Sequence, residues 1–256
     1  MRILLTNDDG VNAPGLKAIH DELIKLGEVT VVAPDTERSS TGQAITLNHP
    51  VYHKVVPLGG MVAGRFKAHS LSGTPTDCVK FAVAVLLKRK PDLVVSGINR
   101  GSNDGCSVFY SGTVSAAREG ALMGIPSLAL SLDSYGDPDF RPAARVSAKI
   151  IRWALKARVP KGTFLNVNVP DLPEEKMRGI KFSEQCLIPI HGIFRKRRDP
   201  SGRAYYWLTG RPSATEKQAW SDTYALQKGF VTVAPIHCDG TDHAFLNKVR
   251  NKVSQL

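Results

Sequence analysis

The sequence predicts an α/β fold with a mainly parallel sheet, and two observations support this prediction. Short apolar runs typical of strands alternate with segments whose apolar residues recur every three or four positions, as in helices. Clusters of Asn, Asp, Ser and Gly follow several strand patterns, and open α/β sheets bind ligands beyond the carboxyl ends of their strands. The 256 residues, 42% hydrophobic and 22% charged, suffice for one large domain or two small ones.

The first 170 residues contain most of the alternating units. Residues 2–6 are an apolar strand pattern, and residues 15–26 place Leu16, Ile19 and Leu23 on one face of a helix. Further strands are expected over residues 29–33, 92–96, 127–131 and 163–169, short strands or hairpins over 44–70, a glycine-rich loop over 97–112, and helices over 74–88, 113–123 and 143–157.

The helix expected over residues 74–88 has the clearest start. Thr74 is a suitable N-cap, Pro75 occupies the first helical position, and Asp77 lies in the first turn, where an acidic side chain favours the helix. The strand pattern over 92–96, with the apolar run Leu93-Val94-Val95, follows this helix.

The chain changes character after residue 170. Residues 171–230 hold Pro, Gly and charged clusters between short alternating runs such as 205–208, which predicts extended hairpins or arms. A strand over 230–234 and a helix over 243–253 follow. We therefore expect one domain with a core of about 1–170 and 230–256, and arm-like extensions of about 171–229 that contribute subunit contacts.

Composition excludes several classes of protein. No apolar stretch approaches the roughly 20 residues that span a bilayer, and Met1-Arg2 leads directly into a strand pattern without a secretory signal. The four cysteines are widely spaced and form no CxxC pair, so we expect reduced thiols. Together these features predict a cytoplasmic protein with no membrane partner.

The formal net charge of +11 favours anionic ligands. The densest basic cluster is Arg195-Lys196-Arg197-Arg198. A solvated loop is the favoured interpretation of this cluster, and a nucleic-acid contact is the alternative. Single-strand binding uses aromatic side chains for base stacking, and the 7% aromatic content gives it little support.

The first candidate site follows the first strand pattern and reads Asn7-Asp8-Asp9-Gly10. Two adjacent carboxylates repel each other, so a cation is expected to hold them together. Asp and Asn offer hard oxygen ligands, which favour Mg²⁺ or Mn²⁺ over a thiolate-bound zinc ion. A plain turn is the alternative, since Asn, Asp and Gly are common in turns.

Three further segments join this candidate. Residues 37–42 form a polar loop, and Asn99 in the loop after the strand over 92–96 can offer a carbonyl oxygen to a metal or an amide N–H to a phosphate. Ser111, Gly112 and Thr113 open the helix over 113–123, where free backbone N–H groups favour an anion. These pieces describe a hard cation beside a phosphate cradle.

Several catalytic motifs are absent from the chain. It has no GxxxxGK[ST], no GxGxxG after the first strand pattern, and no GxSxG. An aspartyl-phosphate phosphatase of the haloacid-dehalogenase type needs DxDx[TV], which the sequence from Asp8 to Val11 does not supply. A nucleic-acid-binding protein with a vestigial metal site remains the alternative from another class.

A set of motifs in one order resembles the SurE (survival protein E) family. These motifs are TNDDG at the start, APDxxRS at residues 33–39, GTPxDCV at 73–79, and SGINxGxNxG running to YSGTVxAAxEG at 96–120. The resemblance is dense over residues 1–131 and looser to about residue 237. The C-terminal strand and residues 181–213 depart from the family pattern, so substrate preference and subunit contacts are the least constrained features.

The resemblance implies a Rossmann-like three-layer core whose arms serve oligomerisation, as dimers or tetramers. It implies a metal-dependent phosphatase, a 5′-nucleotidase that hydrolyses nucleoside 5′- and 3′-monophosphates, with short-chain polyphosphate as a further substrate and a role in stationary-phase or stress survival. The implied metal ligands are Asp8, Asp9, Ser39 and Asn99, and Asp8 or Asp9 doubles as general base. The implied phosphate or substrate contacts are Asn7, Asn103, Ser111, Gly112 and Thr113. No obligatory nucleic-acid partner is expected.

Overall fold

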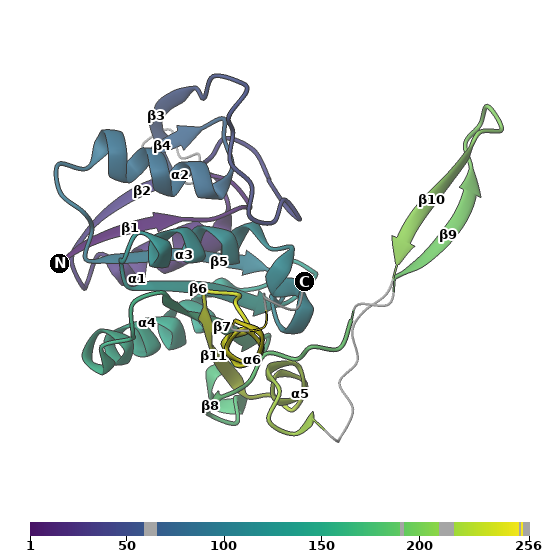
Figure 1. Ribbon diagram of the computed structural model, residues 1–256. Helices are drawn as coiled ribbons and strands as arrows, with labels where there is room; N and C mark the ends of the chain where they lie inside the picture. Colours follow the sequence, from purple (N-terminus) through teal and green to yellow (C-terminus); the bar gives the residue numbers. More distant parts are fainter. Residues whose placement is uncertain (59–65, 190–191, 210–217, 251, 253–256) are drawn as a thin grey trace.

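Six parallel strands form the centre of the fold, as the alternating pattern predicted (Figure 1). The computed structural model describes residues 1–58, 66–189, 192–209, 218–250 and 252. Within these residues the main sheet has the order β3-β4-β2-β1-β5-β6-β7-β11-β8. Its strands are β1 (Arg2–Thr6), β2 (Glu28–Pro34), β3 (His53–Pro57), β4 (Lys67–Leu71), β5 (Leu93–Arg100), β6 (Ser127–Asp133), β7 (Thr163–Pro170), β8 (Ile180–Phe182) and β11 (Val231–His237).

Helices cover both faces of this sheet and give the expected three layers (Figure 1). One face is covered by α1 (Pro14–Leu23) and α4 (Phe140–Ala157), which contact each other, and the other by α2 (Pro75–Phe81) and α3 (Gly112–Leu122). None of the helices in the described ranges is both long and apolar enough to cross a membrane.

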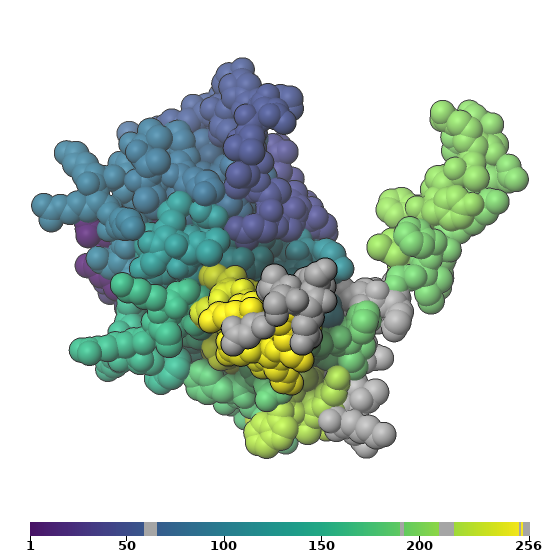
Figure 2. Space-filling model, viewed as in Figure 1, coloured from purple at the N-terminus to yellow at the C-terminus, as the bar shows by residue number. Residues whose placement is uncertain are grey.

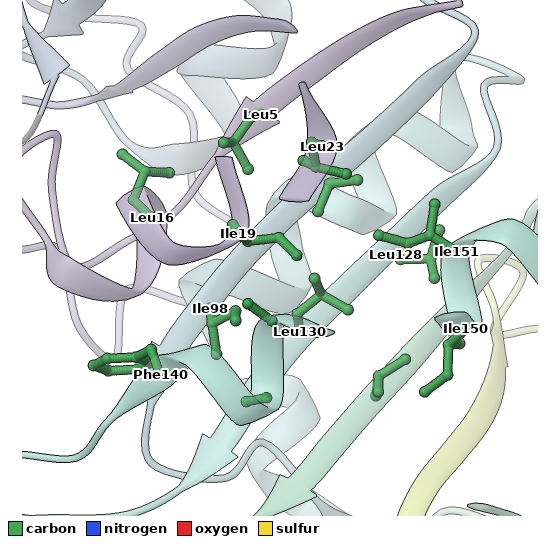
Figure 3. Close-up of a cluster of buried hydrophobic side chains, with 14 of the residues drawn as sticks. Leu5, Leu16, Ile19, Leu23, Ile98, Leu128, Leu130, Phe140, Ile150 and Ile151 are labelled. Carbon is green, nitrogen blue, oxygen red and sulfur yellow. The ribbon is translucent and has the colours of Figure 1, made fainter. Parts of the chain in front are cut away.

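Neighbouring residues of β1 pack into different halves of the core. Leu5 belongs to the cluster beneath α1 and α4, which also contains Leu16, Ile19 and Phe140; Leu16 and Ile19 lie near Leu5 (Figure 3). Leu4 belongs to the opposite cluster with Val79 of α2. Successive strand residues point to opposite faces, so a central strand buried on both faces is apolar throughout. Truncating Leu4 or Leu5 to alanine is expected to lower the free energy of unfolding by about 2–5 kcal/mol.

The helix predicted over residues 74–88 starts as expected and ends early. The Thr74 hydroxyl accepts a hydrogen bond from the Asp77 backbone N–H (3.1 Å), and the Asp77 carboxylate accepts one from the Thr74 N–H (2.8 Å), which completes a capping box. The α-helix stops at Phe81 and a π-helical turn, Ala82–Leu86, follows before the chain becomes extended.

The loop predicted over residues 97–112 is partly strand. β5 continues to Arg100, because after a register shift Asn99 pairs with Ser131 of β6. The Gly97–Ile98 peptide bond is cis, and Gly97 has a φ of +130°. A Cβ at Gly97 would lie 2.2 Å from the Leu130 carbonyl oxygen, so only glycine fits there. A 3-10 turn, Gly105–Phe109, then leads to α3.

The region after β7 contains the expected arm and one unexpected helix. β9 (Ile193–Arg198) and β10 (Ala204–Thr209) form an antiparallel hairpin that projects from the body (Figure 1). Helix α5 (Asp222–Gln227) was not predicted, and α6 (His243–Val249) is shorter than expected. Parts of the predictions over 44–70 and 243–253 fall on residues 59–65, 251 and 253, outside the described residues.

Candidate active site

Asp8 lies two residues after the end of β1 and is 3% exposed. Its carboxylate accepts hydrogen bonds from the side-chain hydroxyl and the backbone N–H of Thr113, in the first turn of α3. Its backbone carbonyl accepts one from the Arg38 N–H (2.7 Å), which holds the loop after β2 against the same place. Burial raises the pKa of Asp8 above its ordinary value despite these donors. Burial therefore makes ionisation of Asp8 less favourable than in water, and a nearby cation would oppose this effect.

Asp9 connects the end of β1 to the end of β5. It is only partly buried and accepts a hydrogen bond from the Arg100 backbone N–H (3.2 Å). Burial and then the neighbouring charge of Asp8 raise the pKa of Asp9 to about 6. The charge of Glu37, in the loop after β2, raises the pKa of both carboxyl groups as well. Three acidic residues from two loops thus converge on one edge of the sheet.

Asn99 presents one free polar atom at this edge. Its side-chain amide donates to the carbonyl oxygens of Arg100 (3.2 Å) and Gly101 (2.8 Å). Both amide hydrogens are used, so the amide oxygen is the atom left for a ligand. Ser39 lies opposite on the exposed loop after β2, where its hydroxyl donates to the Glu37 carboxylate (2.6 Å).

Asn103 is held by polar side chains of β6 and β7. Its backbone N–H donates to the Asn168 side-chain oxygen (2.7 Å), and its carbonyl accepts from the Asn166 amide (2.7 Å). Its own amide donates to the Ser131 hydroxyl (2.8 Å). All four of these side chains are buried, so this network fixes the path of the loop after β5 rather than leaving it free to move.

The residues at the start of α3 have two different roles: Ser111 lines the pocket, whereas Gly112 and Thr113 contact Asp8. Ser111 is the N-cap residue, and its hydroxyl accepts from the Val114 N–H (3.1 Å). Thr113 is fully buried and bonded to Asp8. A Cβ at Gly112 would lie 2.8 Å from the Asp8 Cβ, so glycine lets the helix approach the carboxylate. Asn7 is also buried, donates to the Gly10 carbonyl (2.9 Å), and leaves its side-chain oxygen without a partner among the described residues.

A pocket of about 690 Å³ opens at this edge, a volume in the range of small-ligand sites. Five of the predicted residues line it: Asp8, Ser39, Asn99, Asn103 and Ser111. Asp9, Asn7, Gly112 and Thr113 are not among its lining residues and lie beside or beneath Asp8. The structure therefore brings all the predicted residues to one region. The first group forms the wall of the pocket, and the second group supports that wall.

The donor set around Asp8 and Asp9 suits a hard divalent cation. Neither carboxylate forms an ion pair with a Lys, Arg or His within the described ranges. No group of three His, Cys, Asp or Glu side chains there could hold a metal by itself. A ligand shell at this place would need neutral oxygens, such as those of Asn99 and Ser39, beside the two carboxylates. Carboxylate, amide and hydroxyl oxygens are the ligands that Mg²⁺ and Mn²⁺ prefer.

Sequence reasoning missed two groups of residues at this site. The first is the supporting pair Asn166 and Asn168, whose alternation on a buried strand was a usable signal, because alternate residues share one face. The second is most of the apolar part of the pocket wall, which comes from separate segments: Tyr135, Phe194 and Leu208. Phe194 and Leu208 belong to the hairpin, and nothing in their local sequence indicates this contact.

Comparisons with known proteins show the family of the chain. The sequence profile of the family described as "Survival protein SurE" matches residues 3–189. The chain is 45% identical over 247 residues to the "5'-nucleotidase SurE" of Syntrophobacter fumaroxidans, covering 96% of this chain and 97% of that protein. It is 46% identical over 248 residues to the protein of the same name from Geobacter sulfurreducens, covering 96% and 92%.

A solved structure shows the same fold. The crystal structure of the SurE protein from Aquifex aeolicus superimposes with a TM-score of 0.83 at 37% identity, covering 100% of this chain and 99% of that one. The profile match spans most of the chain, and the relatives are similar in sequence over nearly the whole length of both proteins. This chain therefore belongs to the SurE family.

Proposed function

We propose that this chain is a divalent-metal-dependent nucleotidase that hydrolyses nucleoside 5′- and 3′-monophosphates to nucleoside and phosphate. The observation that carries the proposal is the pair of carboxylates at Asp8 and Asp9, which form no ion pair with any described Lys, Arg or His, beside a pocket of nucleotide size. Relatives that match nearly the whole chain bear the name 5′-nucleotidase, which places the enzyme among phosphoric monoester hydrolases.

Each site residue has a role in this proposal. Asp8, Asp9, Ser39 and Asn99 would hold the cation. A bound Mg²⁺ or Mn²⁺ neutralises phosphate charge and makes water more acidic. Asp9 or Asp8 accepts a proton from the water that attacks the phosphorus atom in line with the leaving sugar oxygen.

The remaining residues orient the phosphate and the nucleoside. Ser111 and the backbone at Gly112 place hydrogen-bond donors and the positive end of α3 near the phosphate oxygens. Thr113 contributes to this part of the site through Asp8, which its hydroxyl and backbone N–H hold in place. Asn103 and Asn7 complete the polar surroundings, and the Asn166–Asn168 network keeps Asn103 in place. Tyr110, Tyr135 and Phe194 offer apolar surface for the base and sugar.

The proposal extends to properties of the whole protein. We infer one SurE-like domain over 1–256, a cytoplasmic location, a role in stationary-phase or stress survival, and activity on short polyphosphate. We also infer a homodimer or homotetramer. Exposed apolar side chains on the edge strand β8 and in the segments that follow it support subunit contacts in the region 171–229: Ile180, Phe182, Leu187 and Trp220.

Phosphate release tests the proposal directly. A panel of 5′- and 3′-nucleoside monophosphates is incubated at neutral pH with Mg²⁺, with Mn²⁺, and with EDTA. Release that EDTA abolishes is the expected result, and the panel ranks bases, sugar positions and metals. If no nucleotide is hydrolysed with either metal, the protein is not a nucleotidase, and a nucleic-acid-binding protein with a vestigial metal site becomes the better description.

A further inference from the structure

A side chamber of about 160 Å³ adjoins the pocket beside Asp8. The two cavities share part of their wall, since Ser102, Ser107 and Tyr135 line both of them. Sites that hold a whole small ligand start at roughly 300 Å³, so the chamber suits one part of a ligand. A ligand that fills the main pocket can therefore extend one of its groups into the chamber across this shared wall.

Three elements of the body line the chamber. Asp104 comes from the loop after β5, Asp133 is the last residue of β6, and Thr223 belongs to α5. Helix α5 forms part of the outer surface of the body, where it is yellow-green in the space-filling view (Figure 2). None of the described hairpin residues lines the chamber, so the body alone sets its walls.

Asp104 is buried at this chamber without a partner for its charge. The residue is 6% exposed. It precedes the 3-10 turn, and its side chain does not cap that turn. Within the described ranges its carboxylate takes part in no hydrogen bond and in no ion pair. Buried carboxylates are normally paired or hydrogen-bonded, so Asp104 offers two acceptor oxygens that lack donors.

The surroundings of Asp104 favour a neutral donor as the missing partner. The nearby Asp222 carboxylate already accepts from three backbone N–H groups. Burial, and to a lesser degree the charge of Asp104, raises the pKa of Asp222. No described Lys, Arg or His lines the chamber, and no three carboxylates in the described part of the chain form a metal-binding group. An anion would be repelled here, and a metal ion would lack ligands.

A nucleotide would enter this chamber with its base, an orientation that rests on the proposed nucleotidase function. The phosphate belongs beside Asp8, and Asp104 and Asp133 would repel it from the chamber. The base is neutral and planar, and it carries N–H donors along one edge. Tyr135 borders both cavities and offers an aromatic ring against which a base can pack.

We propose that the chamber is a base subsite in which Asp104 selects guanine. Guanine carries two adjacent N–H donors, at N1 and at the 2-amino group, and a carboxylate offers two adjacent acceptors. Two parallel hydrogen bonds to a charged group are strong and directional, as in pairs of Arg with a carboxylate. Adenine and cytosine place a ring-nitrogen acceptor beside their amino group. Hypoxanthine lacks the 2-amino group, and xanthine has a carbonyl oxygen in its place, so neither satisfies both oxygens.

Matched changes in the protein and in the base test this assignment. Asp104→Asn keeps one acceptor and turns the other oxygen into a donor. Xanthine keeps the N1 donor of guanine and turns the 2-amino donor into an acceptor. We would measure kcat and KM with Mn²⁺ for the 5′-monophosphates of guanosine, inosine and xanthosine. The proteins are the wild type, Asp104→Asn and Asp171→Asn, which removes an equal charge at an exposed position.

The expected result is a reversal of base preference. The wild type should favour guanosine monophosphate over inosine monophosphate by about 10- to 100-fold in kcat/KM, the effect of one hydrogen bond to a charged acceptor. Most of this difference should lie in KM, because the base is remote from the bond that breaks. Asp104→Asn should favour xanthosine monophosphate over guanosine monophosphate. Asp171→Asn should match the wild type.

Nucleoside binding in EDTA separates the subsite from catalysis. Guanosine, inosine and xanthosine carry the bases without phosphate, and no metal is present. The wild type should bind guanosine most tightly, and Asp104→Asn should bind xanthosine most tightly. If the nucleosides bind in this order but no nucleotide is hydrolysed, the base subsite is supported and the proposed nucleotidase function fails.

Other outcomes would overturn the proposal. Equal kcat/KM for guanosine and inosine monophosphates in the wild type would show that Asp104 does not recognise the base. An equal loss with all three nucleotides in Asp104→Asn, with a thermal melt showing that the variant is folded, would give Asp104 a structural role. If removal of the 2′-hydroxyl from guanosine monophosphate costs more than removal of the 2-amino group, and Asp104→Asn abolishes that cost, the chamber holds the ribose instead.

Discussion

The pocket beside Asp8 and the hairpin that borders it are built in opposite ways. Asp8 is 3% exposed and is held by α3 and by the loop after β2. The hairpin side chains are exposed and contact chiefly one another across two strands. Substitutions in the pocket should therefore change activity and stability together, whereas substitutions in the hairpin should change the capture of ligands alone. The predictions below test this separation, starting with the largest effect.

Asp8→Asn should change activity and stability most strongly, and in opposite directions. We expect turnover of nucleoside monophosphates to fall by about three orders of magnitude, because a cation ligand or the general base is lost. We also expect the metal-free variant to melt at a higher temperature than the metal-free wild type. The neutral amide avoids the unfavourable burial of charge, and its oxygen still accepts from Thr113.

Wild-type protein with and without Mn²⁺ provides the control for Asp8→Asn. The metal should raise the melting temperature of the wild type, because a ligand that binds only the folded state stabilises it. The variant should show little of this increase. Near-normal turnover of Asp8→Asn with added Mn²⁺ would remove Asp8 from the site.

Gly112→Ala should reduce activity by moving Asp8. The new Cβ would lie 2.8 Å from the Asp8 Cβ and 2.9 Å from a carboxylate oxygen, so the carboxylate must shift. Displacements of about 1 Å at a catalytic group reduce rates by about 100-fold. The matched control is Gly240→Ala, where a Cβ meets nothing within 4 Å. Equal activity of the two variants would show that Asp8 does not need this close approach.

The chemistry of the site was predictable from the sequence, but much of its support was not. The apolar run before Asn7-Asp8-Asp9 and the residue types at Asn99 and Ser111 are local signals, and each indicated a group that lies in or beside the pocket. Asn166 and Asn168 act through a contact with Asn103 more than 60 positions away. Such contacts depend on strand order, which β11 further complicates by running antiparallel to β7. The sequence alone does not specify this order.

Helix α5 shows the same limit. The helix is held in place by contacts with residues distant in the sequence. The buried Asp222 carboxylate accepts hydrogen bonds from the backbone N–H groups of Gly105 (2.9 Å), Cys186 (2.9 Å) and Thr223 (2.8 Å). The helix is six residues long, too short for a periodic pattern to be detected.

Asp222→Ala should affect stability more than chemistry, because Asp222 joins the loop after β5 to the region that leads to the hairpin. The loss of the carboxylate leaves buried donors without an acceptor, at a cost of about 3 kcal/mol in the free energy of unfolding. For a chain of this size, that lowers the melting temperature by about 10 °C. Asp171→Ala, at an exposed position, is the control for removal of an acidic side chain. A melting temperature equal to that of the control would show that this junction is not structural.

The pH dependence of stability should reveal the Asp9 carboxyl group. Its pKa is about 6 in the metal-free folded protein and near 3.8 in the unfolded chain, so between these values the folded state binds more protons. The contribution of Asp9 to the free energy of unfolding therefore decreases as pH rises from about 4 to about 6. Denaturant titrations in EDTA should show this slope in the wild type and lose part of it in Asp9→Asn. An identical profile for the two proteins would contradict the raised pKa.

Substitutions in the hairpin are expected to have the smallest effect on the free energy of unfolding. Tyr205→Leu with Trp207→Leu replaces exposed rings that pack on neither the body nor the core clusters, so the free energy of unfolding should change by less than about 0.5 kcal/mol per substitution. The melting temperature should then stay within about 3 °C of the wild-type value. A drop of many degrees that depends on protein concentration would mean that these rings are buried in an oligomer, because dissociation links stability to concentration. In that case substitutions in the hairpin, like those in the pocket, would change both function and stability. The two regions would then not differ in this respect.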